Sequence, residues 1–303
     1  MLLYGKEARV MSTESRYRYT GEPLEDLSKW ATRAARVPEQ AVIDDALAAN
    51  VATLSDLQSR LYAQKETGVI VILQGMDTAG KDGLIRHVLS GLNPAGTSVV
   101  SFKQPTNRQL SHDFLWRVNR ELPERGEIRI FNRSQYEDVL ISRVHPEMLL
   151  TQHIPGVTTL ADVGDAFFDR RYRDLRHFET YLRHQGFVTI KFFLHLSRDE
   201  QTRRFERRIE IPSKNWKFSP SDMQERAFWN DYQVAYTKML TNTATKKDPW
   251  YIIPADDKGV ARLIVSNILV KRLQDLRPTY PQVTPETQAQ LRQTLAKLKN
   301  NEL

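Results

Sequence analysis

The sequence predicts an α/β fold in which helices cover both faces of a parallel sheet. The first observation behind this prediction is an alternation of short apolar segments, rich in β-branched residues, with longer segments of helical periodicity. The second is a glycine-rich segment, residues 75–83, which directly follows the first apolar segment. The five strands are expected at residues 69–73, 98–102, 128–131, 187–194 and 250–253. Such an alternation favours a parallel sheet, whose ligands bind beyond the carboxyl ends of its strands.

Helical periodicity fills most of the chain between these strands. Helices are expected at residues 24–66, 81–89, 108–121, 134–143, 162–184, 198–209, 220–240 and 258–273. Pro212 interrupts the periodicity, so residues 203–220 are expected to form a helical hairpin between the fourth and fifth strands. We divide the chain into a partly helical N-terminal extension at residues 1–50, whose first 20 residues look polar and unstructured, a core at residues 51–275, and a C-terminal helical tail at residues 276–303.

The composition is that of an ordinary globular protein, with 40% hydrophobic and 27% charged residues. The absence of cysteine excludes disulfides, thiolate metal sites and cysteine nucleophiles. The net charge of +7 favours anionic partners, although simple solubility explains it equally well. Neither a signal peptide nor a membrane-spanning apolar run is found, so a cytoplasmic location without membrane association is expected. Met1 and Met11 are both acceptable start sites.

The glycine-rich segment has the pattern G-x-x-x-x-G-K, which predicts a phosphate-binding loop. It follows an apolar strand and opens a helix, so backbone amides, the helix N-terminus and Lys81 can surround a phosphate chain. The alternative is a glycine-rich turn with an exposed lysine. The residues of this loop expected to bind phosphate are Gly75, Thr78, Ala79, Gly80, Lys81, Asp82 and Gly83.

The same loop supplies the expected metal ligands. Asp82 stands where phosphate-binding loops normally carry the Ser or Thr that holds Mg²⁺. Asp77 is the favoured carboxylate ligand, because hard oxygen ligands suit this ion. Asp82 is an alternative ligand or a residue of the outer coordination sphere, or simply an acid favoured by the helix dipole. Asn132, at the end of the third strand, is a neutral oxygen ligand at best.

Two further segments follow strands and are expected to reach the same edge of the sheet. Arg133 can offer a planar set of donors to a transferring phosphoryl group. Ser134-x-x-Glu137 fits a capping box, so Ser134 is expected to cap the next helix rather than to catalyse, and Glu137 to cap alone or to serve the site as well. Lys103, after the second strand, is either a ligand of the acceptor nucleotide's phosphate or an ordinary loop lysine.

The predicted hairpin is strongly basic and resembles a lid. Helical spacing places Arg203 and Arg207 on one face and Arg204 and Arg208 on an adjacent one. A lid closes over phosphates and excludes water, which suppresses hydrolysis. The alternative is a solvated charged helix, in which Glu206 and Glu210 pair with the arginines. Three tryptophans are expected to pack in the lid and core rather than to stack on bases: Trp216, Trp229 and Trp250.

An ordered set of motifs over most of residues 50–275 resembles the family-2 polyphosphate kinases. The motifs are Gly75-Met-Asp-Thr-Ala-Gly-Lys-Asp-Gly83, Phe131-Asn-Arg-Ser-Gln-Tyr-Glu137, Lys214-Asn-Trp-Lys217, Trp229-Asn-Asp-Tyr232 and Asp248-Pro-Trp-Tyr-Ile-Ile-Pro-Ala-Asp-Asp-Lys258. The resemblance implies a fold like that of thymidylate kinase and a homo-oligomer, either a dimer or a tetramer. It also implies phosphoryl transfer between inorganic polyphosphate and nucleotides, with Mg²⁺ and with Mn²⁺ as a substitute.

The same resemblance implies the roles of individual residues. Asp77 corresponds to the metal-binding and catalytic acid and Lys81 to the phosphate-binding lysine. Arg133 corresponds to the arginine of the second loop, which is the segment Asn132–Glu137 after the third strand. The polyphosphate-binding lid residues are Arg203, Arg207, Arg208, Lys214 and Lys217. Many members carry Asp at the position of Asn132, so this chain departs from the usual pair of aspartates. Asn132, Glu137 and Lys103 are expected to face the nucleotide, and Glu137 resembles a marker of the branch that phosphorylates both AMP and ADP.

Two other functions stay open at this level. An ATP-dependent nucleoside monophosphate kinase would share the fold and differ in its phosphate donor. A non-catalytic protein that binds nucleotides or nucleic acid would use the basic surface and show a salt-dependent affinity without turnover. No RNA-recognition motif is present, so nucleic acid is not expected as a partner.

Overall fold

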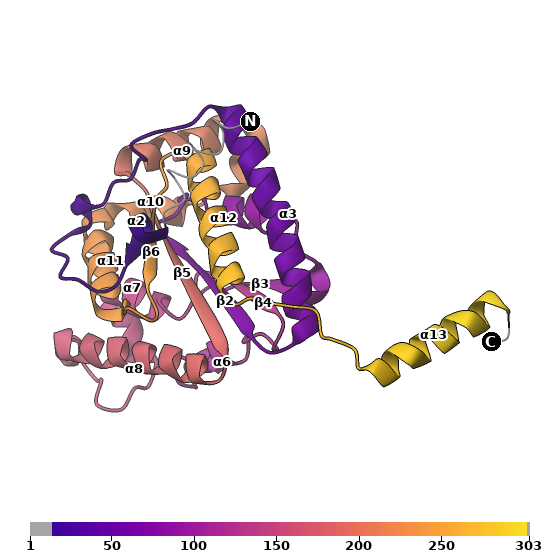
Figure 1. The fold of residues 1–303 in the computed structure, drawn as a ribbon. Coiled ribbons are helices and arrows are strands. Elements are labelled where there is room, and N and C mark those ends of the chain that lie inside the picture. Colours follow the sequence, from indigo (N-terminus) through magenta and orange to yellow (C-terminus); the bar gives the residue numbers. More distant parts are fainter. Residues whose placement is uncertain (1–13, 302–303) are drawn as a thin grey trace.

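A six-stranded sheet forms the centre of the computed structural model, which describes residues 14–301 (Figure 1). Its strands follow the order β1-β6-β5-β2-β4-β3. Their bounds are β1 (Arg18–Tyr19), β2 (Gly68–Gly75), β3 (Thr97–Ser101), β4 (Ile128–Asn132), β5 (Phe187–His195) and β6 (Trp250–Pro254). The five predicted strands are all present and pair in parallel.

The prediction of a purely parallel, five-stranded sheet is wrong at one edge. The strand β1 pairs antiparallel with β6, through Arg18 opposite Tyr251 and Tyr19 opposite Trp250. It lies in a segment that was expected to be unstructured. A strand of two residues is too short to show the alternation by which strands are recognised. Residues 1–13 of the same prediction lie outside the described part of the chain.

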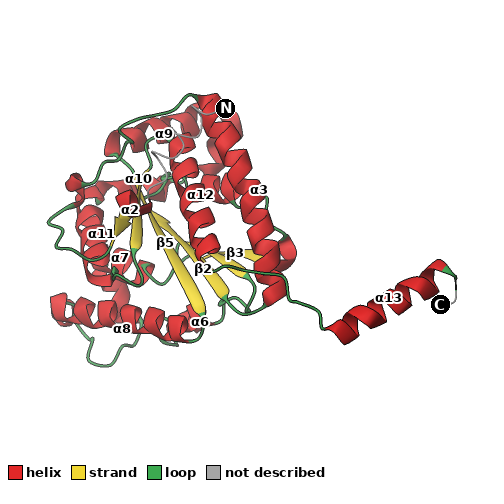
Figure 2. Cartoon of the chain, in the orientation of Figure 1, coloured by secondary structure: helices red, strands yellow, loops and turns green. Residues whose placement is uncertain are grey.

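Helices cover both faces of the sheet, which gives three layers (Figures 1 and 2). One apolar core lies between the sheet and the helices α3 (Gln40–Gln64), α4 (Lys81–Val88) and α12 (Lys258–Asp275). A second core lies on the other face, against α7 (Glu137–Val144), α8 (Asp165–His184) and α11 (Trp229–Thr243). The strand β2 is buried along its whole length between the two cores, as expected for a central parallel strand.

Shorter elements complete the described chain. The remaining α-helices are α2 (Glu14–Tyr17), α5 (Asn107–Leu110), α6 (Trp116–Asn119), α9 (Arg198–Glu210), α10 (Pro220–Ala227) and α13 (Pro285–Lys299). The 3-10 helices are η1 (Leu27–Lys29), η2 (Pro94–Gly96), η3 (Pro146–Thr151), η4 (Leu160–Asp162) and η5 (Pro212–Lys217). Within residues 14–301, no helix has the length and apolar character needed to span a bilayer.

Three predicted helices are interrupted in the structure. The first begins only at Gln40, because Pro38 disfavours helical backbone at the residue before it. The second consists of α5 and α6, separated by a turn in which the Asp113 side chain accepts a hydrogen bond from the Leu115 amide. The third divides at Phe228 into α10 and α11. The predicted boundary at residue 50 falls inside α3, which packs along α12.

The strand register brings several loops to one edge of the sheet. Leu73 pairs with Asn132, Gly75 with Leu194, and His195 with Pro254. The loops that follow β2, β4, β5 and β6 therefore leave the sheet at the same edge, as parallel strands require. This edge carries the glycine-rich loop and lies beneath α9 and η5.

Candidate active site at the carboxyl edge of the sheet

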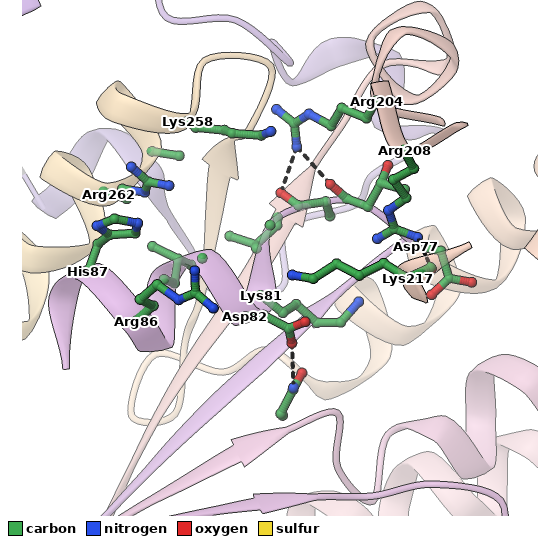
Figure 3. A pocket seen from close by; sticks show the side chains of 18 of the residues that line it. Asp77, Lys81, Asp82, Arg86, His87, Arg204, Arg208, Lys217, Lys258 and Arg262 are labelled. Atoms are coloured by element: carbon green, nitrogen blue, oxygen red, sulfur yellow. Dashed lines mark hydrogen bonds between the residues drawn. The ribbon is translucent and has the colours of Figure 1, made fainter. Parts of the chain in front are cut away.

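A cavity of about 460 Å³ opens at this edge, and basic side chains line much of it (Figure 3). The predicted site residues that line it are Asp77, Thr78, Ala79, Gly80, Lys81, Asp82, Gly83, Asn132, Arg133, Arg207, Arg208, Lys214 and Lys217. The structure therefore brings the glycine-rich loop, the second loop and the lid around one space. Gly75, Lys103, Glu137 and Arg203 are predicted site residues that do not line it.

The glycine-rich loop has the backbone geometry of a phosphate cradle. Gly75, Thr78 and Gly80 have backbone φ values of 150°, 65° and 112°, which residues other than glycine rarely adopt. A Cβ atom on Gly75 would also lie 2.8 Å from the Leu194 carbonyl oxygen, so this glycine is required for the close approach of β2 and β5. Thr78 takes the strained conformation despite its branched side chain, and its buried hydroxyl has no hydrogen-bond partner among residues 14–301.

Lys81 occupies the first turn of α4 and is largely buried. Its Nζ donates to the carbonyl oxygens of Gly75 and Met76, at 2.6 and 3.2 Å. Burial and the neighbouring Arg133 lower the pKa of Lys81 to about 8. The two carbonyl oxygens carry no net charge, so they do not neutralise the Lys81 ammonium. A polyanion bound in the cavity would neutralise it. The alternative of an exposed turn lysine does not hold.

Arg133 links the second loop to the glycine-rich loop. Its Nη2 donates to Asp77 Oδ1 at 2.7 Å, and its Nη1 donates to Glu137 Oε2 at 3.2 Å. The Glu137 carboxylate is the main cause that raises the pKa of Arg133 above its usual range, so its charge is permanent. Its backbone is left-handed, with φ 64°, which indicates that the loop is built to place this side chain.

The expected capping box at the start of α7 is wrong. The Ser134 hydroxyl accepts a hydrogen bond from the Tyr136 amide at 3.3 Å, and the helix begins after Tyr136 without a side-chain cap. Glu137 uses its carboxylate to pair with Arg133 instead. A charged partner at this distance competes successfully with a backbone amide. The motif therefore serves the second loop rather than the helix end.

Each carboxylate predicted to bind metal contacts a side chain at or just after the end of β4. Asp82 Oδ1 accepts a hydrogen bond from Asn132 Nδ2 at 2.9 Å, while Asp77 is held by Arg133. Within the described chain, no group of three His, Asp or Glu side chains is arranged to hold a metal. Mg²⁺ commonly takes one or two protein carboxylates and completes its shell with water and substrate phosphates. The donor chemistry of Asp77, Asp82 and Asn132 fits that pattern.

The lid consists of α9 and η5, residues 198–217, and its inner face is basic. Arg208 is positioned by the carbonyl oxygen of Lys217 at 3.2 Å and by Asp222 of α10 at 3.0 Å. Lys217 lines the cavity together with Asp77 and Lys81 (Figure 3). The lid thus meets the glycine-rich loop over a shared space, rather than standing apart from it.

The phase of α9 turns Arg203 away from the cavity lining, and its expected role in binding polyphosphate stays a prediction. Its side chain is 53% exposed, pairs with Glu200 at 2.8 Å, and lies outside the cavity lining. Arg204 takes the inner position and is buried. It donates to the carbonyl oxygens of Thr78 and Ala79, at 2.8 and 3.0 Å, and to those of Ala255 and Asp256. The solvated-helix alternative describes only the outer face, where Arg203 and Glu206 are exposed.

Five cationic or titratable lining residues were not predicted as site residues. They are Arg86, His87, Arg204, Lys258 and Arg262. Lys258 and Arg262 lie one helical turn apart at the start of α12, which follows β6. Their position after the carboxyl end of a predicted strand could have identified them as site residues. Burial, together with Arg204 and Arg207, lowers the pKa of Lys258 to about 8.

Two remaining predictions concern residues at the margin of the site. Lys103 is exposed, and its carbonyl oxygen accepts a hydrogen bond from Arg117 Nη1 at 2.8 Å. The packing role of Trp229 and Trp250 is confirmed by their burial. The same prediction is wrong for Trp216, which is 76% exposed on the lid with Lys217 Nζ 5.0 Å from its ring centre.

Known proteins resemble this chain over most of its length. A family model described as Polyphosphate kinase 2 (PPK2) matches residues 38–281. The chain is 49% identical to the ADP-polyphosphate phosphotransferase of Rhodopseudomonas palustris, over 88% of this chain and 92% of that protein. It is 44% identical to the AMP/ADP-polyphosphate phosphotransferase of Meiothermus ruber, over 80% of this chain and 85% of that protein.

A solved structure resembles the fold closely. The crystal structure of Polyphosphate Kinase 2 from Arthrobacter aurescens TC1 superposes with a TM-score of 0.80 and 35% sequence identity. The superposition covers 92% of this chain and 95% of that chain. The family match and the identity to full-length relatives together show that the chain belongs to the polyphosphate kinase 2 family.

Proposed function

We propose that this phosphotransferase moves phosphoryl groups from inorganic polyphosphate to AMP and ADP, with Mg²⁺. The observation that carries the proposal is the cavity itself, in which the glycine-rich loop and the basic lid enclose one space. The names of relatives from Rhodopseudomonas palustris and Meiothermus ruber support polyphosphate with ADP and with AMP or ADP as substrates. The rival with ATP as the phosphate donor receives no such support.

The residues of the cavity fit a reaction limited by charge repulsion. The acceptor phosphate of AMP or ADP is already ionised, so no strong general base is needed. Lys81 and Arg133 can neutralise charge on the transferring group, and the lid cations can align the donor chain. Asp77, with Asp82 or Asn132, would hold Mg²⁺, and the ion would supply positive charge that offsets the charge of the phosphates.

The second loop supports the choice of acceptor. Glu137 fixes Arg133 at 3.2 Å, and Arg133 in turn reaches Asp77 on the phosphate loop. An acceptor phosphate near this arginine would therefore lie next to the proposed metal ligand. Asn132 replaces a charged ligand by a neutral one here, which lowers the negative charge that an incoming nucleotide meets. Three expectations stay predictions: that Lys103 faces the nucleotide, that the protein is cytoplasmic, and that it forms a homo-oligomer.

The donor is tested directly by product analysis. Purified enzyme is incubated with Mg²⁺ and AMP or ADP, with either polyphosphate or ATP as the sole phosphate donor, and the nucleotides are separated by chromatography. We expect ADP and ATP to form when polyphosphate is the donor. Turnover of AMP with ATP alone would indicate a nucleoside monophosphate kinase, and RNA affinity without any turnover would indicate a binding protein.

A further inference from the structure

The C-terminal helix α13 carries an apolar stripe that stays exposed in the described part of the chain. Leu291, Leu295 and Leu298 follow helical spacing and are 57%, 52% and 56% exposed. No described residue of α13 is buried, and Figure 1 shows the helix standing away from the body. An isolated helix of 15 residues is marginal in water, so a stripe of this kind indicates a packing partner. The family match ends at residue 281, before this helix begins.

A groove of about 520 Å³ on the body has matching chemistry. One wall is the N-terminal half of α3, with Leu47, Ala48, Val51 and Ala52, and the other includes Gly91. Ala48 and Ala52 are exposed, and Leu47 and Val51 are only partly buried. The groove therefore offers a shallow apolar surface to a leucine-bearing helix.

Charge favours the same pairing. The stretch of α3 at residues 40–55 contains Asp44 and Asp45 and no lysine or arginine. The helix α13 contains Arg292, Lys297 and Lys299 and one acid, Glu286. A basic amphipathic helix laid along this apolar groove gains burial, and its cations gain electrostatic complementarity with Asp44, which lines the groove.

The path of the chain points to a second copy as the owner of that groove. The helix α12 packs along α3 and ends beside its C-terminal half, whereas the groove lies on its N-terminal half (Figure 1). The connection to α13, residues 276–284, contains two prolines, which favour an extended path over a reversal. We propose that α13 of one copy docks its leucine stripe into the α3 groove of a second copy. Reciprocal docking then closes a two-fold dimer.

The proposed dock lies next to the phosphate cavity. His87 lines both the groove and the cavity, so a helix in the groove packs against the outer side of the cavity wall. The docking does not depend on the proposed substrates, because the stripe leucines Leu291, Leu295 and Leu298 do not line the cavity. Dimerisation and turnover can therefore be measured separately on the same variants.

Light scattering on the full chain tests the docking surface. We expect wild type to have the mass of a dimer at micromolar concentration, and Leu291→Asp/Leu295→Asp to have that of a monomer. The matched control is Ala289→Asp/Gln293→Asp, which adds the same charge on the opposite face of α13. It should remain dimeric, and all three proteins should retain turnover, which shows that they fold. Equal masses for the two variants would overturn the proposal.

Cross-linking identifies the partner surface, because the chain contains no native cysteine. Double variants combine Ala48→Cys or Ala52→Cys with a cysteine at each stripe leucine in turn. At least one pair should give a covalent dimer on oxidation, whereas each single variant stays monomeric on a non-reducing gel. Dimers of a single stripe variant would show pairing of two tails. An internal cross-link within one chain would show docking in the chain's own groove, and the absence of any cross-link would exclude this surface.

Discussion

Two lysines of the cavity, the buried Lys81 and the more exposed Lys258, carry its pH sensitivity. Lys81 is held among carbonyl oxygens, and Lys258 lies beside Arg204 and Arg207. Burial lowers the pKa of each lysine to about 8. Both therefore lose their protons just above neutral pH in the free enzyme, at the point where the cavity needs positive charge to hold a polyanion.

We expect kcat/KM for polyphosphate to fall above about pH 8. Two lost protons make the fall steeper than the tenfold per pH unit that one ionisation gives. A bound polyanion favours the protonated lysines, so the corresponding fall in kcat should lie at higher pH. The variant Lys258→Arg keeps its charge, and its profile should fall with the slope of a single ionisation. A flat profile to pH 9.5 would contradict this account.

The two aspartates of the phosphate loop should differ in importance. Asp77 contacts Arg133, whereas Asp82 contacts the neutral amide of Asn132. We expect Asp77→Asn to lower kcat by about 10²–10³ and to raise the Mg²⁺ concentration required, because it weakens both the metal site and the position of Arg133. The variant Asp82→Asn should lose less. Initial rates across a Mg²⁺ titration measure both effects, and equal losses would remove the special role given to Asp77.

At the scale of elements, Arg204 connects the lid helix to the two loops beneath it. Its guanidinium donates to four carbonyl oxygens, two in the phosphate loop and two after β6, and its Nε pairs with Glu200 at 2.9 Å. The lid is therefore anchored at the middle of α9, and the cavity-lining cations Arg207, Arg208, Lys214 and Lys217 lie beyond this anchor. The residue acts on the site through backbone positions.

Replacing Arg204 should destabilise the fold. We expect Arg204→Ala to lower the free energy of unfolding by about 3–5 kcal/mol, because it leaves four carbonyl oxygens without this donor and removes one of the two arginines that pair with Glu200. The neighbouring Arg203→Ala is the matched control, since Arg203 also pairs with Glu200 but is largely exposed. It should cause little measurable change. Urea unfolding followed by circular dichroism compares the two, and similar losses would refute the anchoring role.

At the scale of the whole molecule, the sequence predicts the features that depend on a local pattern of residues, namely the parallel strands and the phosphate loop. The parallel strands were recognisable because β2, β5 and β6 are apolar runs buried on both faces. The phosphate loop was recognisable because its glycines serve a backbone requirement at fixed spacing. The basic hairpin between the fourth and fifth strands already indicated a lid, and the family resemblance added the assignment of its residues to polyphosphate binding.

Tertiary packing decides the features that the sequence did not predict. The inner position of Arg204 rather than Arg203 depends on the rotation of α9 against the loops, which two adjacent arginines do not encode. The cavity wall from Lys258 and Arg262 exists because α12 lies beside α4. The expected cap at Ser134 failed because Arg133 lies close enough to engage Glu137.

The central claim is that Lys81 and the surrounding cations form the site where polyphosphate donates its phosphoryl group. The most direct measurement is the initial rate of ATP formation from polyphosphate and ADP by wild type and by Lys81→Met. We predict that wild type forms ATP and that the variant loses at least about 10²–10³ in rate, with an unchanged circular dichroism spectrum and melting temperature. A variant as active as wild type, or a wild type that forms no ATP from polyphosphate, would contradict the account.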